Sequence, residues 1–79
     1  MAEVKMYTTS WCPDCKMAKM WLDRHDIAYE EINVETTPGA AEFVMSVNNG
    51  RRKVPTFVVG NEAFHCSPFN QRTLEEKFK

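Results

Sequence analysis

Polar and apolar positions alternate in two separate segments of the first half of the chain. The alternation over residues 3–8, and again over residues 27–34, predicts two strands with one face buried. Between them, an apolar stripe at helical spacing predicts a helix over residues 13–26 that packs against the sheet. Pro13 suits the first position of this helix, because the N–H that it lacks would have no intrahelical partner there. The stripe consists of Ala18, Trp21, Leu22 and His25.

The middle of the chain predicts a second helix followed by a hairpin. Thr36 or Thr37 is expected to cap the helix, with Pro38 in its first turn. Two β-rich runs, residues 54–59 and 62–66, are separated by a Gly-Asn dipeptide, which is typical of a β-hairpin.

The last segment predicts a third helix and completes the architecture. Ser67 precedes Pro68 at the start of a run that ends near residue 78 and is expected to cap it. The predicted order is β-α-β-α-β-β-α, an α/β fold with a four-stranded mixed sheet and three helices. The two strands joined through a helix should run parallel, and the hairpin strands antiparallel. A single domain over residues 1–79 accounts for this length.

Length and charge narrow the function classes. The chain has 79 residues and a formal charge of -1, which indicates no general affinity for nucleic acid or anionic lipid. It has no run of about 18 apolar residues, which a membrane-spanning helix requires. The first residues alternate and include an acid at position 3, unlike a basic and then apolar secretion signal. We therefore expect a cytoplasmic monomer with no nucleic-acid or membrane partner.

Two of the three cysteines, Cys12 and Cys15, stand three positions apart where the first predicted helix begins. Unpaired backbone N–H groups and the positive end of the helix dipole lie there, and both favour a thiolate at Cys12. Cys12 is therefore the predicted nucleophile, and Cys15, one turn deeper, the residue that resolves a mixed disulfide. The alternative interpretation of such a Cys-X-X-Cys pair is half of a metal site.

Four short segments together have a specific pattern: YTTSWC at residues 7–12, IAY at 27–29, AEFV at 41–44 and SVN at 46–48. On these segments the chain resembles the glutaredoxins, and especially the mycoredoxins of actinobacteria, over nearly its whole length. The resemblance implies a thioredoxin fold, a glutaredoxin domain over residues 1–79, and thiol-disulfide oxidoreductase activity. It also implies a cis peptide before Pro55, which would face Cys12. The backbone of Val54 would then pair with an extended thiol substrate.

Three departures from the glutaredoxin pattern affect the expected substrate. The dipeptide between the cysteines is Pro13-Asp14, whereas glutaredoxins usually have Pro-Tyr and mycoredoxins Gly-Tyr. The bulky residues 64–66 stand where glutaredoxins generally carry two glycines, and Ser67 keeps the polar cap that follows. Thr8 and Thr9 occupy the place of a lysine that holds the carboxylate of the thiol in many glutaredoxins.

The basic segment of residues 51–53 offers a substitute for that missing lysine, because Arg and Lys bind carboxylates. The alternative is a solvated loop, and the sequence favours neither. Trp11 should form an apolar lip for a target peptide. The residues predicted to bind substrate are Trp11, Pro13, Asp14, Val54, Pro55, Ser67, Arg52 and Lys53.

These features leave three functions open. The first is dithiol reduction of protein disulfides and of mixed disulfides with a low-molecular-weight thiol, glutathione or mycothiol, as co-substrate. The second is an NrdH-like or thioredoxin-like electron donor, because WCPDC is also the active-site string of a thioredoxin-related family reduced by thioredoxin reductase; ribonucleotide reductase would then be a partner. The third is a metal or iron-sulfur carrier that adds Cys66 to the pair, although Cys66 also suits the role of a half-buried apolar residue. No bound cofactor or metal is expected for the first two.

Overall fold

The computed structural model describes residues 3–78 and has the predicted order of elements. The ends of the predicted domain, residues 1, 2 and 79, lie outside the described residues. The elements are β1 (Val4–Thr8), α1 (Pro13–Arg24), β2 (Glu30–Asn33), α2 (Ala40–Val47), β3 (Thr56–Val59), β4 (Glu62–His65) and α3 (Gln71–Phe78). No helix in residues 3–78 has the length and apolar character needed to cross a membrane.

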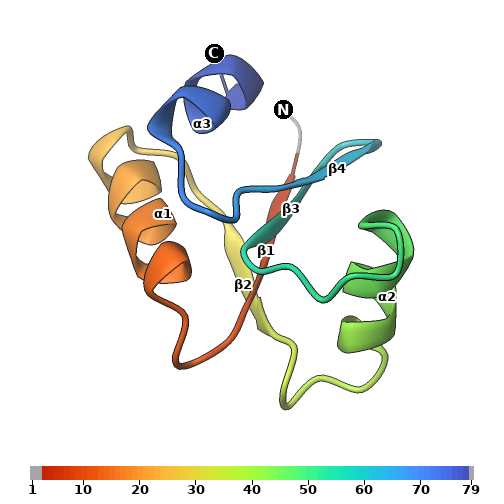
Figure 1. Cartoon of the computed structure of the whole chain (residues 1–79). Helices are drawn as coiled ribbons and strands as arrows, with labels where there is room; N and C mark the ends of the chain where they lie inside the picture. The colour runs from red at the N-terminus through yellow and green to blue at the C-terminus, as the bar shows by residue number, and fades with distance from the viewer. Residues whose placement is uncertain (1–2, 79) are drawn as a thin grey trace.

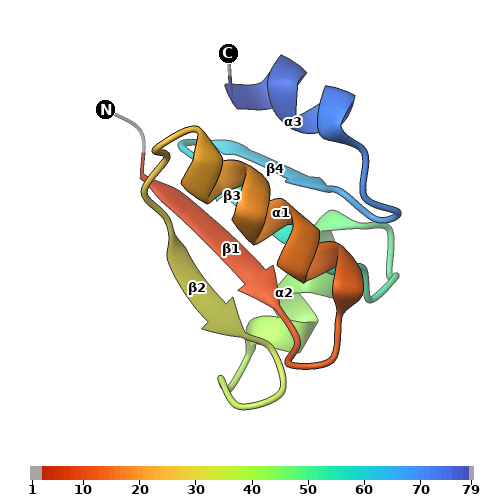
Figure 2. The ribbon, with the colours of Figure 1, turned by 90° about the vertical axis from the view of Figure 1, so that its left-hand side faces the viewer.

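The strands form one mixed sheet in the order β2-β1-β3-β4. As predicted, β1 and β2 are parallel, while β3 and β4 form an antiparallel hairpin, and β3 also pairs antiparallel with β1. Helices α1 and α3 cover one face of the sheet, and α2 alone covers the other (Figure 1). Figure 2 shows α1 lying across β1, with its first turn beside the end of that strand.

The hydrophobic core is concentrated between the sheet and the α1/α3 pair. In β1, Val4, Met6 and Thr8 are buried while the residues between them are only half-buried, as the alternation predicts. The apolar stripe of α1 is also confirmed, except that His25 is only half-buried. Aromatic rings close the core, with contacts between Phe57 and Phe64, Phe57 and Phe78, and Trp21 and Phe78.

The predicted starts of the second and third helices are wrong, because loop contacts satisfy the backbone instead. The carbonyl of Asn33 accepts the N–H groups of Thr36 and Thr37 at 3.3 and 3.0 Å, which places both threonines in a turn. Helix α2 then begins after Gly39, whose left-handed φ of 83° differs from helical geometry, and no side chain caps it. Pro38 therefore lies before the helix rather than in its first turn.

The last helix begins at Gln71, four residues beyond the predicted cap at Ser67. Asn70 takes over the capping role, since its side-chain oxygen accepts the N–H of Arg72 at 2.9 Å. The end of α1 also differs: it stops at Arg24 because Asp26 adopts a positive φ of 56°, and the N–H of Ile27 returns to the carbonyl of Leu22. The strands are shorter than the alternation predicts, and β2 begins only at Glu30.

Candidate active site

Cys12 is the residue that caps α1, at the end of a short loop from β1. Its backbone is extended (φ -84°, ψ 112°), Pro13 takes the first helical position as predicted, and the N–H of Cys15 donates to Cys12 Sγ at 3.0 Å. The cysteine sulfur thus does what an oxygen of Ser or Asp does at other helix starts. Only 4% of Cys12 is exposed, so a reactant reaches the sulfur through a narrow opening.

Cys15 lies one turn deeper and is 1% exposed. Burial raises the pKa of its thiol to about 12, with help from the hydrogen bond to the Cys12 side chain, while a hydrogen bond from the backbone of Thr9 opposes the shift. Cys15 therefore remains a thiol at neutral pH. The two cysteines differ in their position at the helix start, as the sequence predicts, and both are buried.

The wall opposite Cys12 is the segment that leads into β3. The Val54–Pro55 peptide is cis, as predicted, and the Cys12 thiol donates to the carbonyl of Val54 at 3.7 Å. This segment is fixed from both ends. Thr56 Oγ1 donates to the carbonyl of Lys53 at 2.6 Å, and the N–H of Cys66 donates to the carbonyl of Pro55 at 2.9 Å.

Trp11 forms the outer rim of the site and is 68% exposed. Its indole N–H donates to Glu35 at 3.1 Å, and Ser10 donates to the same carboxylate through its hydroxyl at 3.1 Å. These contacts lower the pKa of Glu35, the backbone N–H of Ser10 first and the indole of Trp11 next. Glu35 thus ties the loop before Cys12 to the end of β2.

A small cavity of about 100 Å³ lies between this rim and the segment before β3. The sequence did not identify Glu35, although its position directly after a strand parallel to β1 was a usable signal, because functional groups gather at the carboxyl ends of such strands. The cavity is lined by Thr9, Trp11, Glu35, Arg52 and Val54.

The basic segment, predicted to act as one group, is divided between two sides of the molecule. Arg52 lines the small cavity beside Trp11, where its charge also lowers the pKa of Glu35. Arg51 and Lys53 instead line a different cavity together with His65. The structure therefore brings Arg52, and not Lys53, together with the residues around Cys12.

Cys66 is buried beside the site but is not joined to the cysteine pair. Its sulfur accepts the N–H of Asn70 at 3.3 Å, and burial raises its pKa, with a smaller contribution from the charge of Asp14. Ser67, the next residue, donates its N–H to the ring of His65 at 3.4 Å. Within residues 3–78, no three His, Cys, Asp or Glu side chains are grouped as metal ligands would be. The three-cysteine ligand set of the carrier hypothesis is thus not assembled in this part of the chain.

A polar cluster that the sequence analysis missed lies on the α1 side of β2. Lys19 pairs with Glu31, which also accepts the Thr8 hydroxyl at 2.8 Å. The hydrogen bond with Lys19 lowers the pKa of Glu31, and the same bond raises the pKa of Lys19. The Lys19 charge also acts on Cys15, whose pKa it lowers slightly against the effect of burial.

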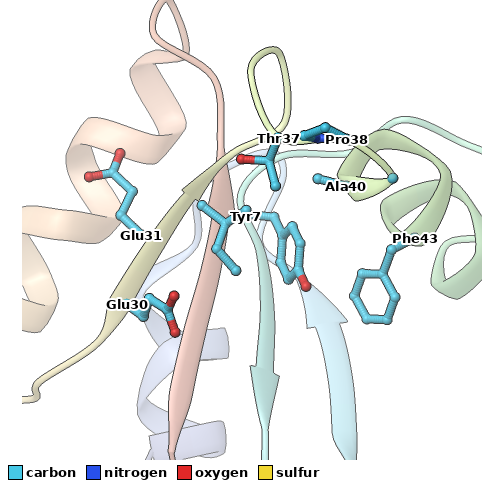
Figure 3. Close-up of a pocket in the computed structure, with 9 residues that line it drawn as sticks. Tyr7, Glu30, Glu31, Thr37, Pro38, Ala40 and Phe43 are labelled. Atoms are coloured by element: carbon cyan, nitrogen blue, oxygen red, sulfur yellow. The ribbon is translucent and has the colours of Figure 1, made fainter.

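The α2 face carries a further cavity of about 450 Å³ that no cysteine of the described chain lines. Figure 3 shows Tyr7 and Phe43 on one side of it and Glu30 on another, while Glu31 extends toward α1. The rings of Tyr7 and Phe43 stack with centroids 4.9 Å apart. This cavity lies on the face of the sheet opposite α1 and contributes no group to the cysteine site.

Comparison with known sequences and structures identifies the protein family to which this chain belongs. The sequence model of the family described as Glutaredoxin matches residues 4–64. The chain belongs to the glutaredoxin family, whose members are thiol-disulfide oxidoreductases. Among solved structures, the crystal structure of glutaredoxin grx-1 from Archaeoglobus fulgidus is 32% identical, with a TM-score of 0.81 over 100% of this chain and 88% of that one. The predicted thioredoxin fold is thereby confirmed.

Named relatives include both glutaredoxins and NrdH proteins. A Mycobacterium tuberculosis protein named as a glutaredoxin is 51% identical over 55 residues, which are 70% of this chain and 66% of the relative, just under two thirds of its length. Mycoredoxin 1 from Corynebacterium glutamicum is 43% identical over 71% of this chain and 68% of its own. The glutaredoxin-like protein NrdH from Lactococcus lactis is 38% identical over 77% of this chain and 82% of its own.

Proposed function

We propose that this protein reduces disulfides by dithiol exchange, with Cys12 as the nucleophile and Cys15 as the resolving thiol. The proposal depends on one observation: the N–H of Cys15 points at Cys12 Sγ while the Cys15 thiol itself is buried. An amide N–H directed at sulfur stabilises a negative charge there, and burial disfavours one. The amide contact therefore supports Cys12 as the proposed nucleophile and Cys15 as the proposed resolving thiol.

In the first step, the Cys12 thiolate attacks one sulfur of a substrate disulfide. A bond forms between Cys12 and that sulfur, the substrate S–S bond breaks, and the other sulfur leaves with the electron pair as a thiolate. The product is a mixed disulfide between Cys12 and the substrate. Because Cys15 is still protonated, it does not compete for the substrate at this stage.

In the second step, Cys15 attacks Cys12 Sγ and releases the second substrate sulfur. The proton of Cys15 is transferred to a departing sulfur, the Cys12–Cys15 disulfide forms, and two electrons have passed from the protein to the substrate. An external thiol or a reductase then returns the pair to its dithiol form. The hydrogen bond between the two cysteine side chains places them within reach of each other for this step.

The substrate is proposed to bind across the opening between Trp11 and Val54. A main-chain group of an extended substrate pairs with the backbone of Val54, as a strand would, while Trp11 offers an exposed apolar surface. Arg52 is the basic residue that lines the cavity beside Trp11, and it is proposed to hold a carboxylate. Pro13, Asp14, Pro55 and Ser67 remain proposed contacts around the same opening.

Two sources of electrons are proposed, and each has support. Glutathione or mycothiol fits the mycoredoxin relative, and thioredoxin reductase fits the NrdH relative, with ribonucleotide reductase as an electron acceptor. The proximity of Glu35 to Arg52 supports the second source, since a carboxylate lining the same cavity offsets part of the positive charge that would hold an acidic thiol.

The test compares three serine variants on one mixed-disulfide substrate and on one protein with an internal disulfide. Cys12→Ser should abolish both activities, whereas Cys15→Ser should retain turnover of the mixed disulfide and lose reduction of the internal one. Cys66→Ser is the matched control and should retain both. Residual activity in Cys12→Ser would overturn the assignment. Running each assay with glutathione, mycothiol or thioredoxin reductase as the only reductant identifies the donor.

A further inference from the structure

A second polar cavity of about 450 Å³ opens on the α2 face, at the end of the sheet where β3 begins and β4 ends. None of the cysteines lines it, and no Asp or Glu within residues 3–78 does either. Basic and amide side chains predominate among the residues that line it, which are Val47, Asn48, Asn49, Arg51, Lys53 and His65. A cavity of this size is large enough for a small-molecule ligand.

The backbone around this cavity is held in place by hydrogen bonds from a buried asparagine. Asn48 Nδ2 donates to the carbonyl of Val44 at 2.7 Å and to Thr56 Oγ1 at 3.0 Å. Thr56 in turn donates to the carbonyl of Lys53, and the N–H of Arg51 donates to the carbonyl of Asn48 at 3.1 Å. The two basic residues are therefore presented from a fixed loop, which reduces the entropy lost on binding.

The charges of Arg51 and Lys53 are not used within the described part of the chain. The ion pairs of residues 3–78 involve Lys5, Lys19 and Lys77 only. Capping of α2 does not need the basic side chains either. The carbonyl of Val44 is taken by Asn48 Nδ2, and that of Met45 accepts the N–H of Gly50 at 2.8 Å.

His65 adds a ring N–H donor to this lining. The N–H of Ser67 donates to His65 Nδ1, so that in the uncharged ring the proton is carried by Nε2. The cavity therefore combines two cationic side chains with one ring N–H. A group with two negative charges and several acceptor oxygens matches this set better than a single carboxylate does.

We propose that this cavity is a binding site for a phosphate group, either as free phosphate or as the phosphate of a small molecule such as a nucleotide. Arg51 binds two phosphate oxygens through its guanidinium fork, Lys53 adds a point charge, and His65 donates a hydrogen bond. The site goes beyond the proposed redox function, because it shares no lining residue with the cavity beside Cys12.

The experiment titrates the reduced ¹⁵N-labelled protein with inorganic phosphate and, separately, with adenosine monophosphate at low ionic strength. Sodium chloride at matched ionic strength is the blank. Amide shifts should concentrate at residues 48–53 and 65, with little change at residues 10–12. Tighter binding of the nucleotide would identify an organic phosphate as the ligand, and equal binding would identify the free anion.

The decisive variants each remove one positive charge from residues 51–53. They differ in whether the lost side chain lines this cavity or the cavity beside Trp11. Arg51→Ala and Lys53→Ala should each weaken binding at least about fivefold, the effect of one charge-assisted contact of about 1 kcal/mol. Arg52→Ala removes the same charge from the same loop on the other side and should leave the affinity within about twofold. Equal losses in all three variants, or no localised shifts with the wild-type protein, would overturn the site. A dispersed spectrum for each variant verifies that it is folded.

Discussion

The two faces of the sheet are covered very differently. The face under α1 and α3 is sealed by aromatic rings and carries both active-site cysteines at its edge. The opposite face is covered by α2, a helix of 8 residues, and retains two cavities of about 450 Å³. In the proposed mechanism the Cys15 sulfur stays protonated in the first step, and a site removed from water favours the thiol form. The thinly covered side leaves polar and charged groups free to meet a ligand.

The largest expected effect is the raised pKa of Cys15, which tests whether the face under α1 and α3 keeps this thiol away from water. Burial raises the pKa of the Cys15 thiol to about 12, so its thiolate fraction at neutral pH should be far smaller than that of a free cysteine. The ¹³Cβ chemical shift of Cys15 should keep its thiol value from pH 6 to about 10. A thiol-to-thiolate change of that signal below about pH 9 would show that the sealed face does not protect it.

A second test removes one ring from each face. Phe57 is fully buried beneath α3, and Phe57→Ala should lower the free energy of unfolding by about 3 to 5 kcal/mol. Phe43→Ala, on α2, deletes the same number of atoms from a half-buried ring and should cost no more than about 2 kcal/mol. Urea unfolding of the reduced proteins measures both. Equal losses would mean that the α2 face is as well packed as the other.

The first strand and the first helix were more accessible to prediction than the start of α2 or the start of α3. The β1 alternation and the α1 stripe follow from simple burial periodicity, and both are found where the sequence places them, as is the cysteine pair at the helix start. The start of α2 was not predictable in the same way. The Asn33 carbonyl at the end of β2 accepts two threonine N–H groups in a turn, and the helix begins only after this turn.

The third test concerns the pair of Lys19 and Glu31, which links α1 to β2. The folded pKa of Glu31 lies below its ordinary 4.5, so the stability that the pair contributes is complete above that pH and is lost as the pH falls through the lowered folded value. Because both side chains are about a third exposed or more, the contribution should be at most about 1 kcal/mol.

Glu31→Gln should therefore flatten the dependence of stability on pH between about 3 and 5 while leaving the fold intact. Glu30→Gln, one residue earlier on the same strand, is the matched control and should keep the slope of the wild type. If the two variants behave alike, the ion pair contributes nothing measurable.

The smallest expected effect tests whether Glu35 positions Trp11. Glu35→Gln keeps the shape of the side chain and removes its charge, and because Glu35 is exposed the stability of the fold should change little. In the wild type the indole N–H signal of Trp11 should shift as Glu35 titrates below its ordinary pKa of 4.5, and Glu35→Gln should abolish that shift. KM for a protein disulfide should rise in the variant while kcat is retained. An unchanged indole titration would remove Glu35 from this role.

The positions of the basic side chains of residues 51–53 could not be predicted from the sequence. Three consecutive basic residues carry no signal in the sequence for which side of the chain each side chain takes. That division follows from the course of the backbone between Asn48 and Val54, which the hydrogen bonds of Asn48 and Thr56 determine. Motif spacing located the reactive sulfurs, whereas the surrounding charges required the folded loop.

The contact between the Cys15 amide and the Cys12 sulfur couples conformational stability to electron affinity. In the proposed mechanism Cys12 reacts as a thiolate, so forming the disulfide would remove the negative charge that the N–H of Cys15 stabilises, and the first turn of α1 would lose a charge-assisted contact. By thermodynamic linkage, a contact that stabilises the helix only when Cys12 is reduced also stabilises the reduced protein. Such a contact makes the protein a weaker electron donor. Loosening that single turn should therefore turn the protein into a stronger reductant.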